Sequence, residues 1–170
     1  HEGPEYINAS SWQTVLRSVE IFAGLWQHPA DRDLEEFATA LAVVVDDEAT
    51  SRWMIHSALE LARVKSICLD DPRQALRILD GNEVDLVLID WQMPGMNGIE
   101  LCSAIRALPR QKDTPLVFVT GRTDFETRAR STLSGGDDFM AKPFLPAELA
   151  ARALTHVLGN WLRRGSWGSG

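Results

Sequence analysis

Residues 84–98 read VDLVLIDWQMPGMNG, an apolar run that ends at Asp90 and continues into a segment of turn-forming residues. A second apolar run, LAVVV at 41–45, stops at the pair Asp46 and Asp47. Short apolar runs of this kind are typical of strands that are buried on both faces of a parallel sheet. Two such strands that stop at acidic residues predict that carboxylates gather at the carboxyl edge of one sheet.

Strand-like and helix-like segments alternate from residue 41 onward. The predicted strands, rich in Val, Ile, Leu and Phe, are 41–46, 64–69, 84–90, 115–120 and 138–141. The predicted helices are 49–62, 72–80, 97–108, 123–134 and 146–162. Asp71 and Pro146 support two helix starts, because Asp suits the N-cap and Pro suits the first turn. Gly81 and Pro109 support two helix ends, because Gly suits the position just past a helix and Pro often follows one.

This alternation predicts an α/β fold, a five-stranded parallel sheet with helices on both faces. The usual order for five such strands is the flavodoxin-like order 2-1-3-4-5, whose switch point lies between the first and third strands. Asp46, Asp47 and Asp90 end those two strands. Ligands of such folds bind outside the carboxyl ends of the strands, so the acidic residues converge where a site is expected.

The first 40 residues stand outside the alternation. Apolar residues at helical spacing predict one amphipathic helix there: Trp12, Val15, Leu16, Val19, Phe22, Leu25 and Trp26. We expect a helical extension over 1–28, a linker over 29–40, one domain over 41–163 and a flexible tail over 164–170. Because the chain begins with His1 rather than Met, we expect it to be a piece of a longer protein.

The composition bounds the partners. The 170 residues carry a formal net charge of -7, and Lys and Arg form no stripe, so no nucleic-acid partner is expected. No apolar run approaches the ~20 residues that span a bilayer, and no signal peptide is visible, so we expect no membrane insertion and a cytoplasmic location. Cys68 and Cys102 have no metal-ligand spacing, and free thiols are expected rather than a disulfide.

Carboxylates gathered at one point repel each other. At about 4 Å and an effective dielectric constant of about 20, one such pair costs about 4 kcal/mol. Either the pKa values of the carboxyl groups rise or a divalent cation binds, and an all-oxygen site suits Mg²⁺. The alternative is that some acids only cap the following helices. The pair Asp46 and Asp47 does not separate these hypotheses alone, but the segment from Asp90 to Gly98 favours a site.

Two more polar residues end strands of the same sheet. Thr120 ends the fourth predicted strand, and Lys142 directly follows the fifth. Both are therefore expected at the carboxyl edge, beside the acidic residues. A hydroxyl and an ammonium group beside a cation-bound carboxylate can hold the oxygens of a phosphoryl group.

Together these residues resemble the receiver domain of two-component response regulators. The resemblance covers about residues 41–163 and rests on Asp46-Asp47, Asp90, 93–98, Thr120-Gly121, Phe139 and 142–144. It implies that Asp90 is the phosphoacceptor and that Mg²⁺ binds Asp46, Asp47, Asp90 and the backbone carbonyl of Gln92. It further implies that Lys142 pairs with the phosphoryl group and that Thr120 and Phe139 form a switch pair.

The function implied by this resemblance is signalling rather than enzymatic turnover. Asp90 accepts a phosphoryl group from the phosphohistidine of a histidine kinase or phosphotransfer protein. The domain then switches through Thr120 and Phe139, and slow self-dephosphorylation resets it. Gln92 and Arg122 lie two residues past Asp90 and Thr120, at positions that in this family border the path of the attacking water. Their bulk is expected to alter the phosphoryl lifetime.

Two other functions share parts of this pattern. A phosphatase of the haloacid-dehalogenase type would also use a carboxylate nucleophile and Mg²⁺, but its nucleophile and acid/base lie two residues apart at the first strand. Here Asp46 is followed by Asp47 and Glu48, and no cap insertion is present. A flavodoxin-like flavin carrier would need a hydroxyl-rich phosphate loop after the first strand, which is missing.

The N-terminal segment has two interpretations. Aligning residues 3–9 with 136–142 places Tyr6 on Phe139 and Ala9 on the position of Lys142. In one interpretation the segment is the tail of a preceding receiver domain, and in the other it is an unrelated amphipathic helix. In both cases its apolar face must be covered, so we expect docking on the domain or self-association through this helix.

Overall fold

The computed structural model describes residues 40–121 and 135–164. The helical extension and linker predicted over 1–40, except Ala40, and the helix predicted over 123–134 lie outside these residues. The tail predicted over 164–170 also lies outside them, except Arg164, which is the last residue of α6. The elements in chain order are β1 (Leu41–Val45), α2 (Ala49–Leu61), β2 (Lys65–Leu69), α3 (Pro72–Gly81), β3 (Leu86–Ile89), α4 (Gly98–Ala107), the 3₁₀ helix η2 (Pro109–Gln111), β4 (Leu116–Thr120), β5 (Asp138–Ala141) and α6 (Pro146–Arg164).

The five strands form one parallel sheet in the order β2-β1-β3-β4-β5. The predicted fold class and strand order are confirmed. β1 and β3 are neighbours, and their register pairs Val45 with Ile89. Because Asp46 and Asp90 follow these two paired residues, they leave the sheet side by side at its carboxyl edge. A hydrogen bond of 2.8 Å from the Asp90 amide to the Val45 carbonyl continues the ladder to that edge.

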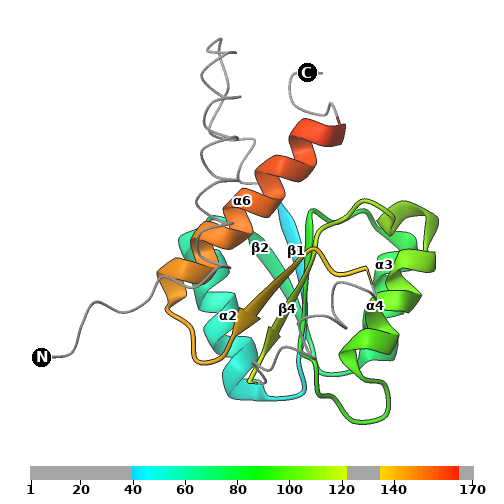
Figure 1. The fold of residues 1–170 in the computed structure, drawn as a ribbon, viewed down its shortest axis with the longest axis horizontal. Helices are drawn as coiled ribbons and strands as arrows, with labels where there is room; N and C mark the ends of the chain where they lie inside the picture. The colour runs from blue at the N-terminus through cyan, green and yellow to red at the C-terminus, as the bar shows by residue number, and fades with distance from the viewer. Residues whose placement is uncertain (1–39, 122–134, 165–170) are drawn as a thin grey trace, which may run out of the picture.

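Helices cover both faces of the sheet, α2 and α6 on one side and α3 and α4 on the other (Figure 1). The side chains of β1 alternate between the two cores. Val44 packs with Ile55 of α2 and Leu149 of α6, whereas Val45 packs with the core under α3 and α4. All five side chains of β4 are buried, as expected for a central strand of a doubly covered parallel sheet. Among the described residues, no helix combines the length and apolar character needed to cross a membrane.

The predicted cap of α3 is confirmed, whereas one predicted helix end is wrong. Asp71 caps α3 through a hydrogen bond of 2.9 Å from the Arg73 amide to its side chain. Asn97 caps α4 in a reciprocal pair with Glu100. Gly81 was expected just past the end of its helix, but it is the last residue of α3, and extended Asn82 follows it. The α3 end therefore uses no left-handed glycine.

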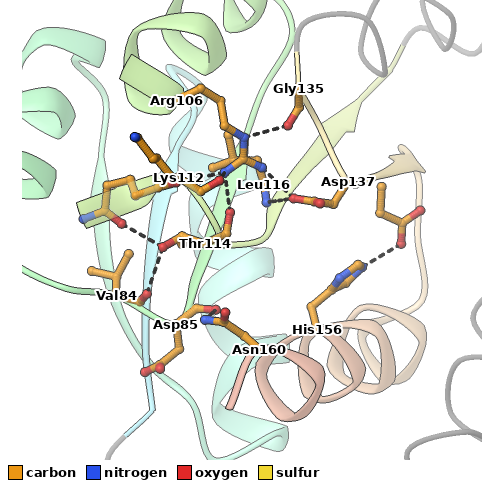
Figure 2. A network of polar contacts seen from close by, with 12 residues as sticks. Val84, Asp85, Arg106, Lys112, Thr114, Leu116, Gly135, Asp137, His156 and Asn160 are labelled. Atoms are coloured by element: carbon orange, nitrogen blue, oxygen red, sulfur yellow. Dashed lines mark hydrogen bonds and ion pairs between the residues drawn. The ribbon is translucent and has the colours of Figure 1, made fainter. Parts of the chain in front are cut away.

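A polar network closes the amino edge of the sheet, opposite the acidic residues (Figure 2). Arg106 of α4 donates to the carbonyls of Gly135 and Thr114, at 2.8 Å and 2.6 Å, and to the Asp137 carboxylate at 2.6 Å. Asp137 also accepts the Leu116 amide at 2.8 Å. One arginine thus joins the starts of β4 and β5, which fixes the two strands that carry Thr120 and Lys142 to the other edge.

Candidate functional site

Three carboxylates meet at the carboxyl edge of the sheet. Asp46, Asp47 and Asp90 each place one carboxylate oxygen within 4.8 Å of the others. Asp46 and Asp90 are buried, 1% and 8% exposed, whereas Asp47 is exposed to solvent. The cluster expected from the ends of the first and third strands is present. It is buried on its protein side and open at Asp47.

Lys142 lies between two of these acids. Its ammonium nitrogen is 2.6 Å from Oδ2 of Asp46 and 3.2 Å from Oδ1 of Asp90. Lys142 is placed by the sheet, because its backbone amide donates to the Thr120 carbonyl at 2.8 Å, immediately past the ends of β4 and β5. Two buried carboxylates thus share one ammonium group, which offsets their mutual repulsion.

Burial and charge pull the pKa values of these groups in opposite directions. Burial raises the pKa of Asp90 above its ordinary value, and the repulsion of Asp46 adds to this, although the Lys142 charge works against it. Burial alone would lower the pKa of Lys142, but its hydrogen bonds and ion pairs with Asp46 and Asp90 outweigh burial and raise that pKa. Lys142 is therefore cationic in the site, and Asp90 is a more basic carboxylate than an exposed aspartate.

Asp46 is held by groups that the sequence did not identify. The Ser51 hydroxyl in the first turn of α2 donates to Oδ2 of Asp46 at 2.6 Å, and the Glu48 amide donates to Oδ1 at 2.9 Å. The Arg52 guanidinium donates to the Asp46 backbone carbonyl at 2.7 Å. The sequence does show a serine five residues past an acid at a strand end, but the direction of the serine side chain depends on the turn between the two residues.

The loop after β3 folds back tightly on Asp90. The Gln92 amide donates to Oδ2 of Asp90 at 3.0 Å, and the Gly98 amide donates to the Trp91 carbonyl at 3.0 Å. A Cβ atom on Gly98 would lie 2.4 Å from the backbone oxygen of Asp90. Only glycine fits there without movement of the backbone, so the Gly that closes the 84–98 stretch is required by a close approach.

The two residues expected as a switch pair lie on adjacent strands. Thr120 ends β4 and is buried, 1% exposed, and its register partner on β5 is Ala141. Phe139 is 7% exposed and pairs in register with Phe118. Phe118 also contacts Trp91, with ring centroids 5.4 Å apart, so Phe118 connects the strand position next to Phe139 with the first residue of the loop that follows Asp90.

A groove of about 520 Å³ runs beside the acidic cluster. It is lined by Asp47, Trp91, Gln92, Met93, Pro94, Asn97 and Ile99. The exposed carboxylate of Asp47 therefore faces a concave, partly apolar surface rather than a convex one. Met93, one of the residues that line this groove, is itself buried.

The donor set of this edge fits Mg²⁺. The three carboxylates are all-oxygen ligands within reach of one point, and the exposed side of the cluster leaves room for water, which Mg²⁺ retains. The described residues contain no other group of three His, Cys, Asp or Glu side chains so close together. Cys68 and Cys102 are not joined by a disulfide bond, and neither belongs to this group of acids.

The family model described as the response regulator receiver domain matches residues 42–154. This chain belongs to that family. Receiver domains are the signalling domains of response regulators, so the predicted family is confirmed. The match runs from the second residue of β1 through β5 and includes the acidic cluster and the first half of α6.

Relatives with different names share this domain. The phosphate regulon transcriptional regulatory protein PhoB of Pseudomonas aeruginosa is 36% identical over 110 residues, which cover 65% of this chain and 48% of PhoB. The cyclic di-GMP phosphodiesterase response regulator RpfG of Xanthomonas campestris pv. campestris is 35% identical over 131 residues, 76% of this chain and 33% of RpfG. The chain thus spans half or less of the length of these relatives.

Solved receiver domains share the fold. The chemotaxis protein CheY4 of Vibrio cholerae has a TM-score of 0.62 and 30% identity, over 65% of this chain and 92% of CheY4. The receiver domain of the sensor histidine kinase PA1611 from Pseudomonas aeruginosa has a TM-score of 0.65 and 26% identity, over 71% of this chain and 98% of that domain. The PA1611 structure has a magnesium ion coordinated in its active site cleft.

Proposed function

We propose that this receiver domain is a phosphoacceptor whose acceptor residue is Asp90. The observation that supports this most directly is the placement of the Asp90 carboxylate, 8% exposed, beside Asp46, Asp47 and the ammonium group of Lys142. A carboxylate with a raised pKa is a better nucleophile than an ordinary one once it is ionised. The donor is the phosphohistidine of a histidine kinase or of a phosphotransfer protein.

The chain's own residues divide the chemistry between them. An oxygen of Asp90 forms a bond to phosphorus as the phosphorus–nitrogen bond of the phosphohistidine breaks, and the leaving imidazole nitrogen keeps the electron pair and takes a proton. The ammonium group of Lys142 then moves toward the oxygens of the transferred phosphoryl group. Mg²⁺ held by Asp46, Asp47, Asp90 and the Gln92 carbonyl would neutralise charge on the phosphoryl group. Water later hydrolyses the acyl phosphate, and Gln92 and Arg122 border the path by which this water attacks.

The same proposal assigns the switch to Thr120 and Phe139. The Thr120 hydroxyl donates a hydrogen bond to the phosphoryl group and draws the end of β4 toward it. Phe139, on the adjacent strand, occupies the space that becomes free. This is a shift between two packings, driven by the new charge and its acceptor oxygens.

The chain matches only 48% of PhoB, which is named as a transcriptional regulatory protein, and 33% of RpfG, which is named as a cyclic di-GMP phosphodiesterase response regulator. The names of these relatives therefore do not carry over to this chain. Within the chain we propose a receiver domain over 41–163 that acts as a signalling module in the cytoplasm. A helical extension over 1–28 and a linker over 29–40 precede the domain, and a tail follows Arg164, the last residue of α6. The extension docks on the domain or on a second copy.

Mass spectrometry of the intact chain tests the acceptor function. Incubation with acetyl phosphate and Mg²⁺ should add one phosphoryl group, and addition of EDTA or omission of the donor should prevent it. A protein that hydrolyses phosphate esters in repeated turnovers, without forming a labelled species, would instead favour the phosphatase interpretation.

A further inference from the structure

One oxygen of Asp46 accepts two short hydrogen bonds from different elements. Oδ2 lies 2.6 Å from the ammonium nitrogen of Lys142 and 2.6 Å from the hydroxyl of Ser51. Asp46 and Ser51 are buried, 1% and 5% exposed. Hydrogen bonds from a hydroxyl to a carboxylate at this distance belong to the strong, charge-assisted class. The Ser51 hydroxyl therefore stabilises the Asp46 carboxylate more than a serine on an exposed helix surface would.

The two donors differ in what else they contact. Lys142 also reaches Asp90 at 3.2 Å, so its ammonium group is shared with the proposed acceptor. The Ser51 side chain donates to Asp46, five residues earlier in the chain, and α2 fixes its position. Oδ1 of Asp46 is occupied separately by the Glu48 amide. When Lys142 turns toward a phosphoryl group, the described contacts leave Ser51 as the side-chain donor on Oδ2.

We propose that Ser51 is a positioning residue that holds the Asp46 carboxylate in its metal-binding orientation, as a second donor beside Lys142 on the same oxygen. The part of this inference that concerns the turn of Lys142 rests on the proposed acceptor function. A buried carboxylate oxygen that loses its donor is costly, so a second donor lets Lys142 leave Asp46 without the carboxylate rotating. A hydroxyl serves this purpose because it is neutral and does not repel a divalent cation, as an ammonium group does.

Groups that orient a metal ligand from behind typically change metal affinity by about 10- to 100-fold when they are removed. The test is an isothermal titration of Mg²⁺ alone into the full 170-residue chain. Ser51→Ala should raise the Mg²⁺ dissociation constant roughly tenfold or more. Ser57→Ala, a serine substitution later in the same helix, should leave it unchanged. Circular dichroism confirms that each variant is folded, and Ser51→Cys, a poorer donor of similar size, replaces Ser51→Ala if that variant does not fold.

A double-variant cycle separates positioning from a general structural effect. In the Lys142→Ala background Ser51 is the remaining side-chain donor to Oδ2, so Ser51→Ala should weaken Mg²⁺ binding by a larger factor there than in the wild type. The inference is overturned if Ser51→Ala leaves the Mg²⁺ dissociation constant within about twofold of the wild-type value. It is also overturned if Ser51→Ala weakens Mg²⁺ binding by the same factor in both backgrounds.

These outcomes are independent of phosphoryl transfer. If the wild type binds Mg²⁺ but acetyl phosphate never labels it, the proposed function fails and the titration still decides the role of Ser51. If labelling occurs normally and Ser51→Ala does not change the Mg²⁺ affinity, only the inference about Ser51 fails.

Discussion

The ammonium nitrogen of Lys142 lies 3.2 Å from Oδ1 of Asp90, so the proposed acceptor carboxylate is already paired before any phosphoryl group arrives. Lys142 reaches this place from the end of β5, on the edge strand of the sheet. Its position on the carboxylate oxygens makes it a competitor of Mg²⁺ as well as a partner of the phosphoryl group. This double role leads to opposite expectations for metal binding and for signalling.

Lys142→Ala should tighten Mg²⁺ binding roughly tenfold, about 1.4 kcal/mol, because a positive charge leaves the site and two carboxylate oxygens become available. The same variant should still be labelled by acetyl phosphate, but more slowly. Titration calorimetry measures the first effect and intact mass the second. Lys112→Ala, which removes an exposed lysine, is the control. Weaker Mg²⁺ binding in Lys142→Ala than in Lys112→Ala would contradict the competition.

Gly98→Ala should destabilise the fold by about 1–3 kcal/mol, since the added Cβ meets the Asp90 backbone oxygen at 2.4 Å. The clash moves the backbone that carries the acceptor, so phosphoryl labelling should also slow. The matched control is Gly81→Ala, because a Cβ on Gly81 has no atom within 4 Å. Urea unfolding of both variants measures the difference, and equal stabilities would show that the loop accommodates a side chain.

Thr120→Ala should leave labelling of Asp90 intact but remove the conformational response. The hydroxyl is lost near the carboxyl edge of β4, whereas the acidic cluster and Lys142 keep their places. Amide exchange in β5, residues 138–141, reports the response with and without acetyl phosphate. Thr120→Ser keeps a hydroxyl and should keep the response. Identical exchange changes in the wild type and in Thr120→Ala would exclude the switch role.

Asp138 makes the stability of the fold depend on acid pH. Burial alone would raise its pKa, but the hydrogen bond and charge of His156 and the charge of Arg152 outweigh burial and hold the pKa below its ordinary value of 3.8. A depressed carboxyl pKa contributes stability that is complete above the unfolded-state pKa. This stability is lost as the pH falls from there through the lower native pKa.

Asp138→Asn should therefore cost about 3 kcal/mol near neutral pH, because Arg152 is only 3% exposed and loses its buried partner. The difference from the wild type should shrink as the pH falls below 3.8, where the Asp138 carboxyl becomes protonated first in the unfolded state and then, at lower pH, in the native state. Unfolding curves across this range measure it. Asp80→Asn, on the exposed side of α3, serves as the control. A difference that stays constant down to the acid limit would rule out Asp138 as the cause.

The sheet and the gathering of the acids followed from the sequence for a simple reason. Buried parallel strands are short apolar runs, and such runs end where polar residues begin, so Asp46, Asp90, Thr120 and Lys142 each marked the end of a strand. Strand order then placed Asp46 beside Asp90, as the Val45–Ile89 register confirms. The ends and the order of the strands depend on the path of the backbone, and the pattern of apolar residues in the sequence indicates that path.

Contacts that depend on side-chain direction were not predictable in the same way. The bond from Ser51 to Asp46 requires a particular turn between β1 and α2, and the close approach of Gly98 to Asp90 requires a particular loop path. Arg106 and Asp137 are 31 residues apart and carry no shared pattern. Gly81 was assigned past its helix from residue type alone, whereas α3 includes it before the extended Asn82.

Peptide mapping of the labelled protein tests the central claim most directly. After reaction with acetyl phosphate and Mg²⁺, the acyl phosphate is reduced to a stable product and the modified residue is located by tandem mass spectrometry. We predict that the modification lies on Asp90 alone and that Asp90→Asn carries none. Modification of a different residue, or equal labelling of the wild type and Asp90→Asn, would contradict the assignment of Asp90 as the phosphoacceptor.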